Sequence, residues 1–145
     1  DPDFIRLRTL AIPNHTELYG DFASGSFEKL TDREMAEETL LFLEHLEGIT
    51  STVKSDHVLN LFQEVEGRLP EDKAAMTAVI REFLAMTPED RMLYQVGRRL
   101  GLFSRLADMT ASPARRAQAE STCQQYGIHP GNVDRTVDEL MKRFI

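Results

Sequence analysis

The chain has 145 residues, a formal net charge of −7 at pH 7 and a single cysteine, Cys123. This length fits one domain that buries a core without cross-links, and one cysteine excludes both an internal disulfide and a metal cluster held by cysteines of this chain alone. No apolar run approaches the roughly 18 residues of a membrane span, and no signal-peptide pattern opens the sequence. We therefore expect a protein of the reducing cytoplasm that does not insert into a membrane.

The charge is unevenly distributed along the chain. Residues 91–145 contain nine Lys or Arg and five Asp or Glu, a balance of +4, whereas residues 1–90 contain eight and nineteen, a balance of −11. The acidic part argues against nucleic-acid binding, because such binding draws most of its affinity from the neutralisation of phosphates. We expect the basic part to dock on the acidic part of the same chain. Its arginines include Arg98, Arg99, Arg105, Arg115 and Arg116.

Residues 1–30 predict a strand followed by a loop with a short helical turn. Residues 4–11 alternate so that Arg6 and Arg8 share one face of the strand. A proline ends the strand, and the glycines and serines that follow predict loop. A lone strand leaves backbone groups unpaired, so we expect it to pair with residues 51–54 or with a second copy of the chain, or else to be loose.

Residues 31–109 predict a helical core. Thr31 and Glu34 form a capping-box signature at the start of a helix that is expected to end at Gly48. Its inward side chains are expected to be Met35, Leu40, Phe42, Leu43 and Leu46.

Two further helices are predicted within this core, the first over about residues 71–86. Thr87 and Pro88 then supply a cap and a first-turn proline for the next helix, which is expected to continue past Gly101. Gly97 and Gly101 lie four residues apart, a spacing that allows another helix to approach closely. We interpret that spacing as packing.

Residues 110–145 predict a helical hairpin. Ser112 and Pro113 begin an alanine-rich helix, and Asn132 is expected to cap the last helix after a turn. Two helices joined by a short turn also describe a DNA-reading motif, but the acidic residues of the last helix argue against that role. The predicted fold is therefore mainly α, with five or six helices and one N-terminal strand.

The stretch from Thr50 to Pro70 concentrates the most chemistry. A β-branched run is expected to lead into a short helix that Ser55 or Asp56 caps and Gly67 closes in the left-handed conformation. Helical spacing then buries a stripe of apolar side chains and leaves a row of polar side chains on the opposite side of the helix. This polar row can bind a ligand or orient a proton carrier. The alternative is the solvated face of an ordinary amphipathic helix. The stripe is Val58, Leu61, Phe62 and Val65, and the row is His57, Asn60 and Glu64, with Asp56 at its edge.

No motif for independent catalysis is present in the sequence. The four histidines lack metal-ligand spacing, and there is neither a glycine-rich phosphate loop nor a nucleophile elbow. Nothing near Cys123 in the sequence lowers the pKa of its thiol. We therefore assign no catalytic residue and no metal ligand.

Residues 3–13, Asp-Phe-Ile-Arg-Leu-Arg-Thr-Leu-Ala-Ile-Pro, followed by His15-Thr-Glu-Leu-Tyr, resemble the end of the radical S-adenosylmethionine barrel in iron–sulfur oxidoreductases related to oxygen-independent coproporphyrinogen oxidases. Residues 31–100 resemble the helical C-terminal region of that family, through Thr50-Ser-Thr-Val-Lys-Ser-Asp-His-Val-Leu-Asn-Leu and Glu66-Gly-Arg-Leu-Pro-Glu-Asp. The resemblance ends before Thr110. The chain departs from the family in lacking its Cys-x3-Cys-x2-Cys motif, and it opens without a methionine, as a piece of a longer polypeptide does.

The resemblance implies a parent protein whose barrel binds a 4Fe–4S cluster and S-adenosylmethionine. This chain carries neither cofactor, is not catalytic alone, and closes the barrel or shapes its substrate site. Its partner is the missing barrel of the same polypeptide. Residues 1–30 then form the last barrel strand and its connection, residues 31–109 the helical core and residues 110–145 the hairpin.

The same resemblance implies the site residues. Asp56, His57 and Asn60 lie on the substrate side, and Arg6 or Arg8 faces the barrel interior and meets a carboxylate or the cofactor. The alternative for the arginines is a solvated strand edge.

Two other functions remain open, a free-standing helical interaction module and a nucleic-acid-binding domain. The truncated barrel predicts an orphan strand and an exposed apolar surface, whereas the interaction module predicts a closed bundle with residues 1–12 packed on it.

Overall fold

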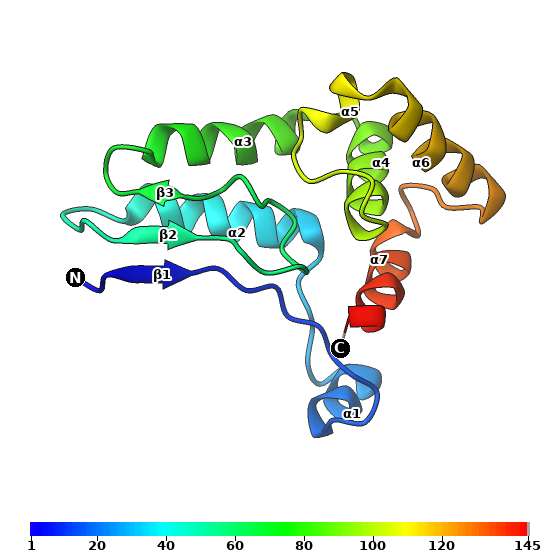
Figure 1. The fold of residues 1–145 in the computed structure, drawn as a ribbon. Helices are drawn as coiled ribbons and strands as arrows, with labels where there is room; N and C mark the ends of the chain where they lie inside the picture. The colour runs from blue at the N-terminus through cyan, green and yellow to red at the C-terminus, as the bar shows by residue number, and fades with distance from the viewer. Residues whose placement is uncertain (145) are drawn as a thin grey trace.

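A computed structural model describes residues 1–144 of the chain (Figure 1). The predicted mainly helical class is confirmed, and no helix in the described part of the chain is long and apolar enough to cross a membrane. The elements are β1 (Phe4–Arg6), α1 (Glu17–Ser24), α2 (Asp32–His45), β2 (Thr52–Lys54), β3 (Gly67–Arg68), α3 (Lys73–Ala85), α4 (Pro88–Arg99), α5 (Asp108–Ala111), α6 (Pro113–Gln125), α7 (Val133–Met141) and a short 3-10 turn, η1 (Lys142–Phe144).

The three strands form one small sheet in the order β1-β2-β3, with β1 parallel to β2 and β2 antiparallel to β3. The expected pairing of the first strand with residues 51–54 is confirmed, in a register that sets Ile5 beside Val53. The regular strand ends at Arg6, however, and not at Ala11. Between the two parallel strands the chain passes through α1 and α2, and α2 lies behind the sheet in Figure 1.

The capping box that was predicted at Thr31 is formed. The Thr31 hydroxyl accepts the Glu34 N–H at 3.2 Å, and the Glu34 carboxylate accepts the Thr31 N–H at 2.8 Å, so each satisfies a free donor of the first turn. The hydrogen bonds from Thr31 lower the pKa of Glu34. The helix ends at His45 and buries Leu43 completely, whereas Phe42, which was expected to point inward, is 42% exposed because it lies about 100° around the helix from Leu43.

Helix α4 is the centre of the structure. Its eight residues from Met92 to Arg99 are all buried. Tyr94 stacks between Phe62 and Phe103, with ring centroids 6.4 and 6.3 Å away, and its hydroxyl donates to the Leu61 carbonyl at 2.9 Å. Helices α6 and α7 pack against α4 (Figure 1), so a single apolar cluster extends from α2 to α7.

The expected continuation of α4 past Gly101 is wrong. The helix ends at Arg99, and Gly101 has a φ of +74°, which turns the chain back on itself. The returning segment places the Phe103 ring where a Cβ at Gly97 would lie, so an aromatic ring, and not another helix, occupies that space.

The expected helix after Ser55 is also wrong. Residues 55–66 form turns without helical hydrogen bonding, and Val58 is 45% exposed although it was assigned to the buried stripe. Asn60 was assigned to the polar row opposite that stripe and is only 4% exposed. Gly67 is not left-handed but belongs to β3, where the Asp72 side chain fills the space beside it.

The turn before α7 differs in one detail from its prediction. Asn132 makes no side-chain cap to α7. Its amide oxygen accepts the His129 N–H at 2.8 Å and its amide nitrogen donates to the Gly127 carbonyl at 3.0 Å, so it stabilises the turn between α6 and α7 instead.

Candidate functional site

One face of the sheet is turned away from the core. Ile5 and Val53 pack into the apolar cluster, so the alternating residues on either side of them lie on the opposite face. The register sets Phe4 beside Thr52, Arg6 beside Lys54 and Thr52 beside Arg68. We call these five residues, Phe4, Arg6, Thr52, Lys54 and Arg68, the open sheet face.

Three of the predicted site residues meet at one edge of this face. The guanidinium groups of Arg6 and Arg8 each lie 3.8 Å from the Asp56 carboxylate. All three side chains are about half exposed, at 59%, 47% and 45%. Exposed pairs of this length stabilise a fold little, and one carboxylate faces two cations. The cluster therefore retains surplus positive charge that an incoming anion can meet.

Asn60 is placed differently from these three. Its amide oxygen accepts the Thr9 N–H, and its amide nitrogen donates to the Leu7 carbonyl and to the Ser55 hydroxyl, all at 3.0 Å. The side chain thus connects the chain after β1 to the loop that carries Asp56. Its contact with a substrate stays a prediction, but the structure gives it a positioning role toward the arginine cluster.

His57 lies next to Asp56 in the same loop and is half-buried. Its Nδ1 accepts the Leu59 N–H at 3.4 Å, which is a long and weak bond. The histidine is therefore not held by strong protein contacts, and its role toward a substrate also stays a prediction.

Two buried arginines at the end of α4 hold this loop through its backbone carbonyls. They were not among the predicted site residues. Arg98 donates to the Val58 carbonyl at 3.1 Å, and Arg99 donates to the Leu59 carbonyl and pairs with Asp32 at 2.8 Å. Burial lowers the pKa of Arg98. The Arg99 pair confirms that a basic residue of the second part docks on the acidic first part. The available signal was two adjacent arginines in the last turn of a helix whose apolar stripe includes Met92, Leu93 and Val96.

A shallow recess of about 580 Å³ adjoins the open sheet face on the side of Lys54 and Arg68. Glu64 lines it and accepts the Leu106 N–H at 2.8 Å through one oxygen, while its other oxygen is buried without a partner among residues 1–144. Burial raises the pKa of Glu64. Arg105 completes the recess, so cationic side chains predominate beside this carboxyl group.

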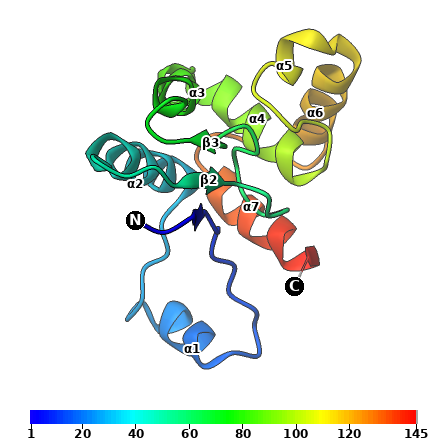
Figure 2. The same cartoon turned by 60° about the vertical axis from the view of Figure 1, so that its left-hand side comes forward.

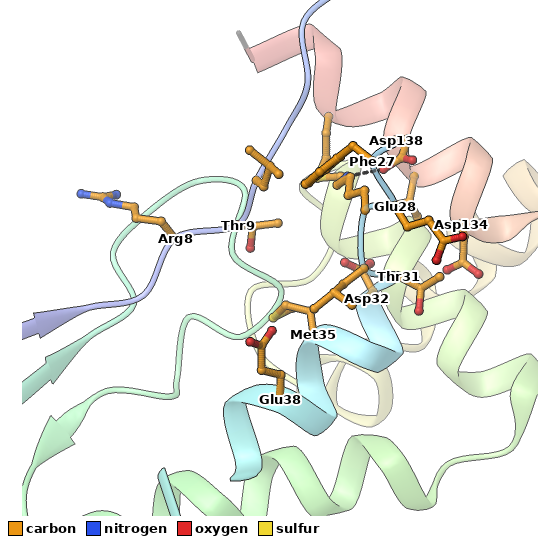
Figure 3. A pocket seen from close by; sticks show the side chains of 15 residues that line it. Arg8, Thr9, Phe27, Glu28, Thr31, Asp32, Met35, Glu38, Asp134 and Asp138 are labelled. Atoms are coloured by element: carbon orange, nitrogen blue, oxygen red, sulfur yellow. Dashed lines mark hydrogen bonds and ion pairs between the residues drawn. The ribbon is translucent and has the colours of Figure 1, made fainter. Parts of the chain in front are cut away.

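A second cavity, of about 390 Å³, lies between residues 8–10 and 27–31 on one side and helices α2 and α7 on the other (Figure 3). Figure 3 shows Arg8 at one side of the cavity with its guanidinium directed away from the carboxylates of Asp32 and Asp134. Arg8 therefore presents its charge to the cluster with Asp56, and the cavity itself is acidic and apolar.

Three of the carboxylates that line this cavity, those of Asp32, Asp134 and Asp138, have protein partners. The Gln95 amide nitrogen lies 3.3 Å from Asp32 and 3.4 Å from Asp134, and Arg99 neutralises Asp32. Partial burial raises the pKa of Asp134, and the negative charges of Asp32 and Asp138 add to the shift. Within residues 1–144 no group of three or more His, Cys, Asp or Glu is arranged to hold a metal ion.

The residues of this chain do not fit the cofactor that the resemblance implies for the parent. A 4Fe–4S cluster takes cysteine thiolates as ligands, and Cys123, the one cysteine, is buried in α6 with its pKa raised by burial. One cysteine therefore cannot supply the ligands of such a cluster. No family model, curated protein or solved structure matches the chain.

Proposed function

We propose that this chain is the C-terminal helical region of a cytoplasmic radical S-adenosylmethionine iron–sulfur oxidoreductase, and that its open sheet face forms part of the substrate site. The barrel that precedes it in the same polypeptide supplies the 4Fe–4S cluster and S-adenosylmethionine. The chain has no activity alone in this proposal. The resemblance of residues 3–13 and 31–100 supports it.

The observation that carries the proposal is the free edge of β1. The Asp3 carbonyl and the Leu7 N–H bond to β2, each at 2.9 Å, so the backbone groups of Phe4 and Arg6 point to the other edge, where no strand of residues 1–144 pairs with them. The unpaired N–H and C=O groups of an edge strand are a template for pairing with a further strand. A preceding barrel strand would satisfy these groups and cover Phe4, which is 61% exposed.

The charges of the open sheet face indicate an anionic substrate group. Arg6 and the neighbouring Arg8 share the Asp56 carboxylate. The Arg68 side chain forms no ion pair within residues 1–144, although the Asp72 carboxylate accepts the Arg68 backbone N–H at 2.8 Å. Lys54 of the same face is paired with Glu66. Residues 1–90 carry a balance of −11, so this concentration of arginines is local. A guanidinium binds a carboxylate through two parallel hydrogen bonds, which makes arginine suited to such a group.

A specific observation also favours the second candidate, a free-standing interaction module. Residues 1–12 are not loose, because β1 pairs with β2, Asn60 binds Leu7 and Thr9, and Ile12 is buried. In that case the free edge of β1 binds another protein or a second copy of the chain.

The test uses the full polypeptide that the gene encodes. Arg6→Gln combined with Arg8→Gln should lower substrate turnover by roughly tenfold or more, because hydrogen bonds to charged groups are each worth about 1.5–3 kcal/mol. Cleavage of S-adenosylmethionine without substrate should not change. Arg33→Gln is the matched control, since Arg33 is equally exposed and pairs with Glu37 on α2, away from the site. Equal turnover in the variant and the control would contradict the proposal, as would a purified polypeptide without a cluster.

A further inference from the structure

Residues 10–30, which we call the arm, are only loosely attached to the remaining structure. Their helix, α1, buries none of its eight residues, and Ile12 is the one buried residue of the whole arm. Figures 1 and 2 both show α1 standing apart from the other helices, joined to them by two extended segments. Segments with few buried apolar contacts open at low free-energy cost.

Both ends of the arm are fixed. At one end Asn60 holds the Thr9 N–H and the Leu7 carbonyl in two partly buried hydrogen bonds. At the other end the capping box fixes Thr31 at the start of α2. The arm is therefore attached to the remaining structure at two defined ends, Thr9 and Thr31.

Between these points the arm covers the cavity of Figure 3. Leu10, Phe27 and Leu30 line the cavity from the arm, and Met35, Val137 and Met141 line it from α2 and α7. Opening the arm would expose this apolar floor. With the arm in its observed position the cavity has a volume of about 390 Å³, within the range of small-molecule sites.

One ion pair ties the arm to α7 across the cavity. The Lys29 ammonium binds the Asp138 carboxylate, and the Lys29 side chain is only 9% exposed, against 32% for Asp138. The other polar contact is weaker, because Lys142 lies 5.6 Å from the Tyr19 ring centroid and is also bound to Glu139. The desolvation of a buried ion pair offsets much of its attraction, and water solvates both charges again when the arm opens. The free energy needed to break the pair is therefore small.

We propose that the arm is a strap that opens and closes over this cavity about its two fixed ends, with the Lys29–Asp138 ion pair as its latch. The inference goes beyond the proposed function and does not depend on it.

Hydrogen exchange followed by mass spectrometry on the 145-residue chain tests the strap. In Asp138→Asn the amides of residues 10–30 should exchange roughly tenfold faster or more, because Lys29 is left buried without a counter-charge, while those of α2 and α4 keep their rates. Glu37→Gln is the control, since it removes an exposed ion pair of α2 that does not involve the arm. It should leave the arm within about twofold of the unaltered chain.

A second variant separates a latch from general destabilisation. Lys29→Met combined with Asp138→Leu replaces the ion pair by apolar side chains of similar volume, which should hold the strap closed and return the exchange of residues 10–30 to within about threefold of the unaltered chain. Three results would overturn the proposal. They are an unchanged arm in Asp138→Asn, an equal acceleration in the arm, α2 and α4, and a double variant as open as Asp138→Asn.

Discussion

Helices α1 and α4 both begin after a threonine, yet they differ in capping and in burial. Thr87 caps α4 by accepting the Asp90 N–H at 3.1 Å, whereas the Thr16 hydroxyl makes no cap and donates to the Pro13 carbonyl at 2.8 Å. Helix α4 then buries eight residues and α1 none. Local signals begin a helix, but its stability comes mostly from the surfaces that the rest of the chain packs against it.

The aromatic residues show the same contrast. Tyr94 of α4 belongs to a cluster with Phe62, Phe83 and Phe103. In α1, the ring centroids of Tyr19 and Phe22 lie 6.4 Å apart, and neither ring contacts another aromatic ring among the described residues. The chain thus combines a packed body, which includes Leu59, Leu61 and Phe62 of the loop after Ser55, with an arm that packs little. The side chains of the arginine cluster lie on the exposed surface of the body.

The largest effect is expected at Phe62. Phe62→Ala should lower the free energy of unfolding by about 3–5 kcal/mol, because the side chain is 4% exposed and its loss leaves a cavity against Phe83 and Tyr94. Phe22→Ala, on α1, should cost less than about 1 kcal/mol. Urea denaturation of both variants measures the difference. Equal losses would refute the contrast between body and arm.

The next largest effect on stability is expected at Asn60, a residue of the body that holds the chain at the start of the arm. Asn60→Ala should cost about 2 kcal/mol, because it removes four hydrogen bonds and leaves the Thr9 N–H and the Leu7 carbonyl unpaired. The Thr9 amide should also exchange faster with solvent. A variant as stable as the unaltered chain, with a protected Thr9 amide, would show that Asn60 does not position the strand exit.

A smaller effect is expected from Asp134, where α7 meets the cavity. The pKa of Asp134 is raised in the folded state, chiefly by partial burial, so its contribution to stability is fully present below the ordinary aspartate pKa and is lost as the pH rises through the raised value. Asp134→Asn should therefore raise the urea midpoint slightly at pH 7. The gain should disappear below about pH 4. A gain that is independent of pH would contradict this account.

The smallest effect on stability is expected at His57. His57→Ala should change the free energy of unfolding by no more than about 0.5 kcal/mol, because the side chain makes one long hydrogen bond. In the full polypeptide the same change should lower activity, since we propose that His57 faces the substrate. If the loss of activity only follows a loss of folded protein, His57 is a structural histidine.

Elements with local signals could be predicted from the sequence. The capping box at Thr31 and the Thr87-Pro88 pair lie within the helices that they begin, so no distant residue is needed to interpret them. The loop after Ser55 could not be predicted. Its residues have helical spacing, but Asn60 bonds to Leu7 and Thr9, which are more than 50 positions away, and these bonds replace a helical turn.

The candidate site follows the same division. The strand alternation placed Arg6 and Arg8 on one face, Asp56 was expected at the edge of a helix, and the resemblance implied all three as site residues. Their meeting depends on the pairing of β1 with β2, which was among the expected partners. The arginines below the loop were missed, because a buried cation is recognised only when its partners, the carbonyls of Val58 and Leu59, are known.

The measurement that tests the proposed function most directly is the coding sequence immediately upstream of Asp1. We predict that the reading frame continues upstream into a barrel that contains a Cys-x3-Cys-x2-Cys motif. A stop codon directly upstream, or a continuous reading frame without that motif, would contradict the proposal and favour the free-standing interaction module.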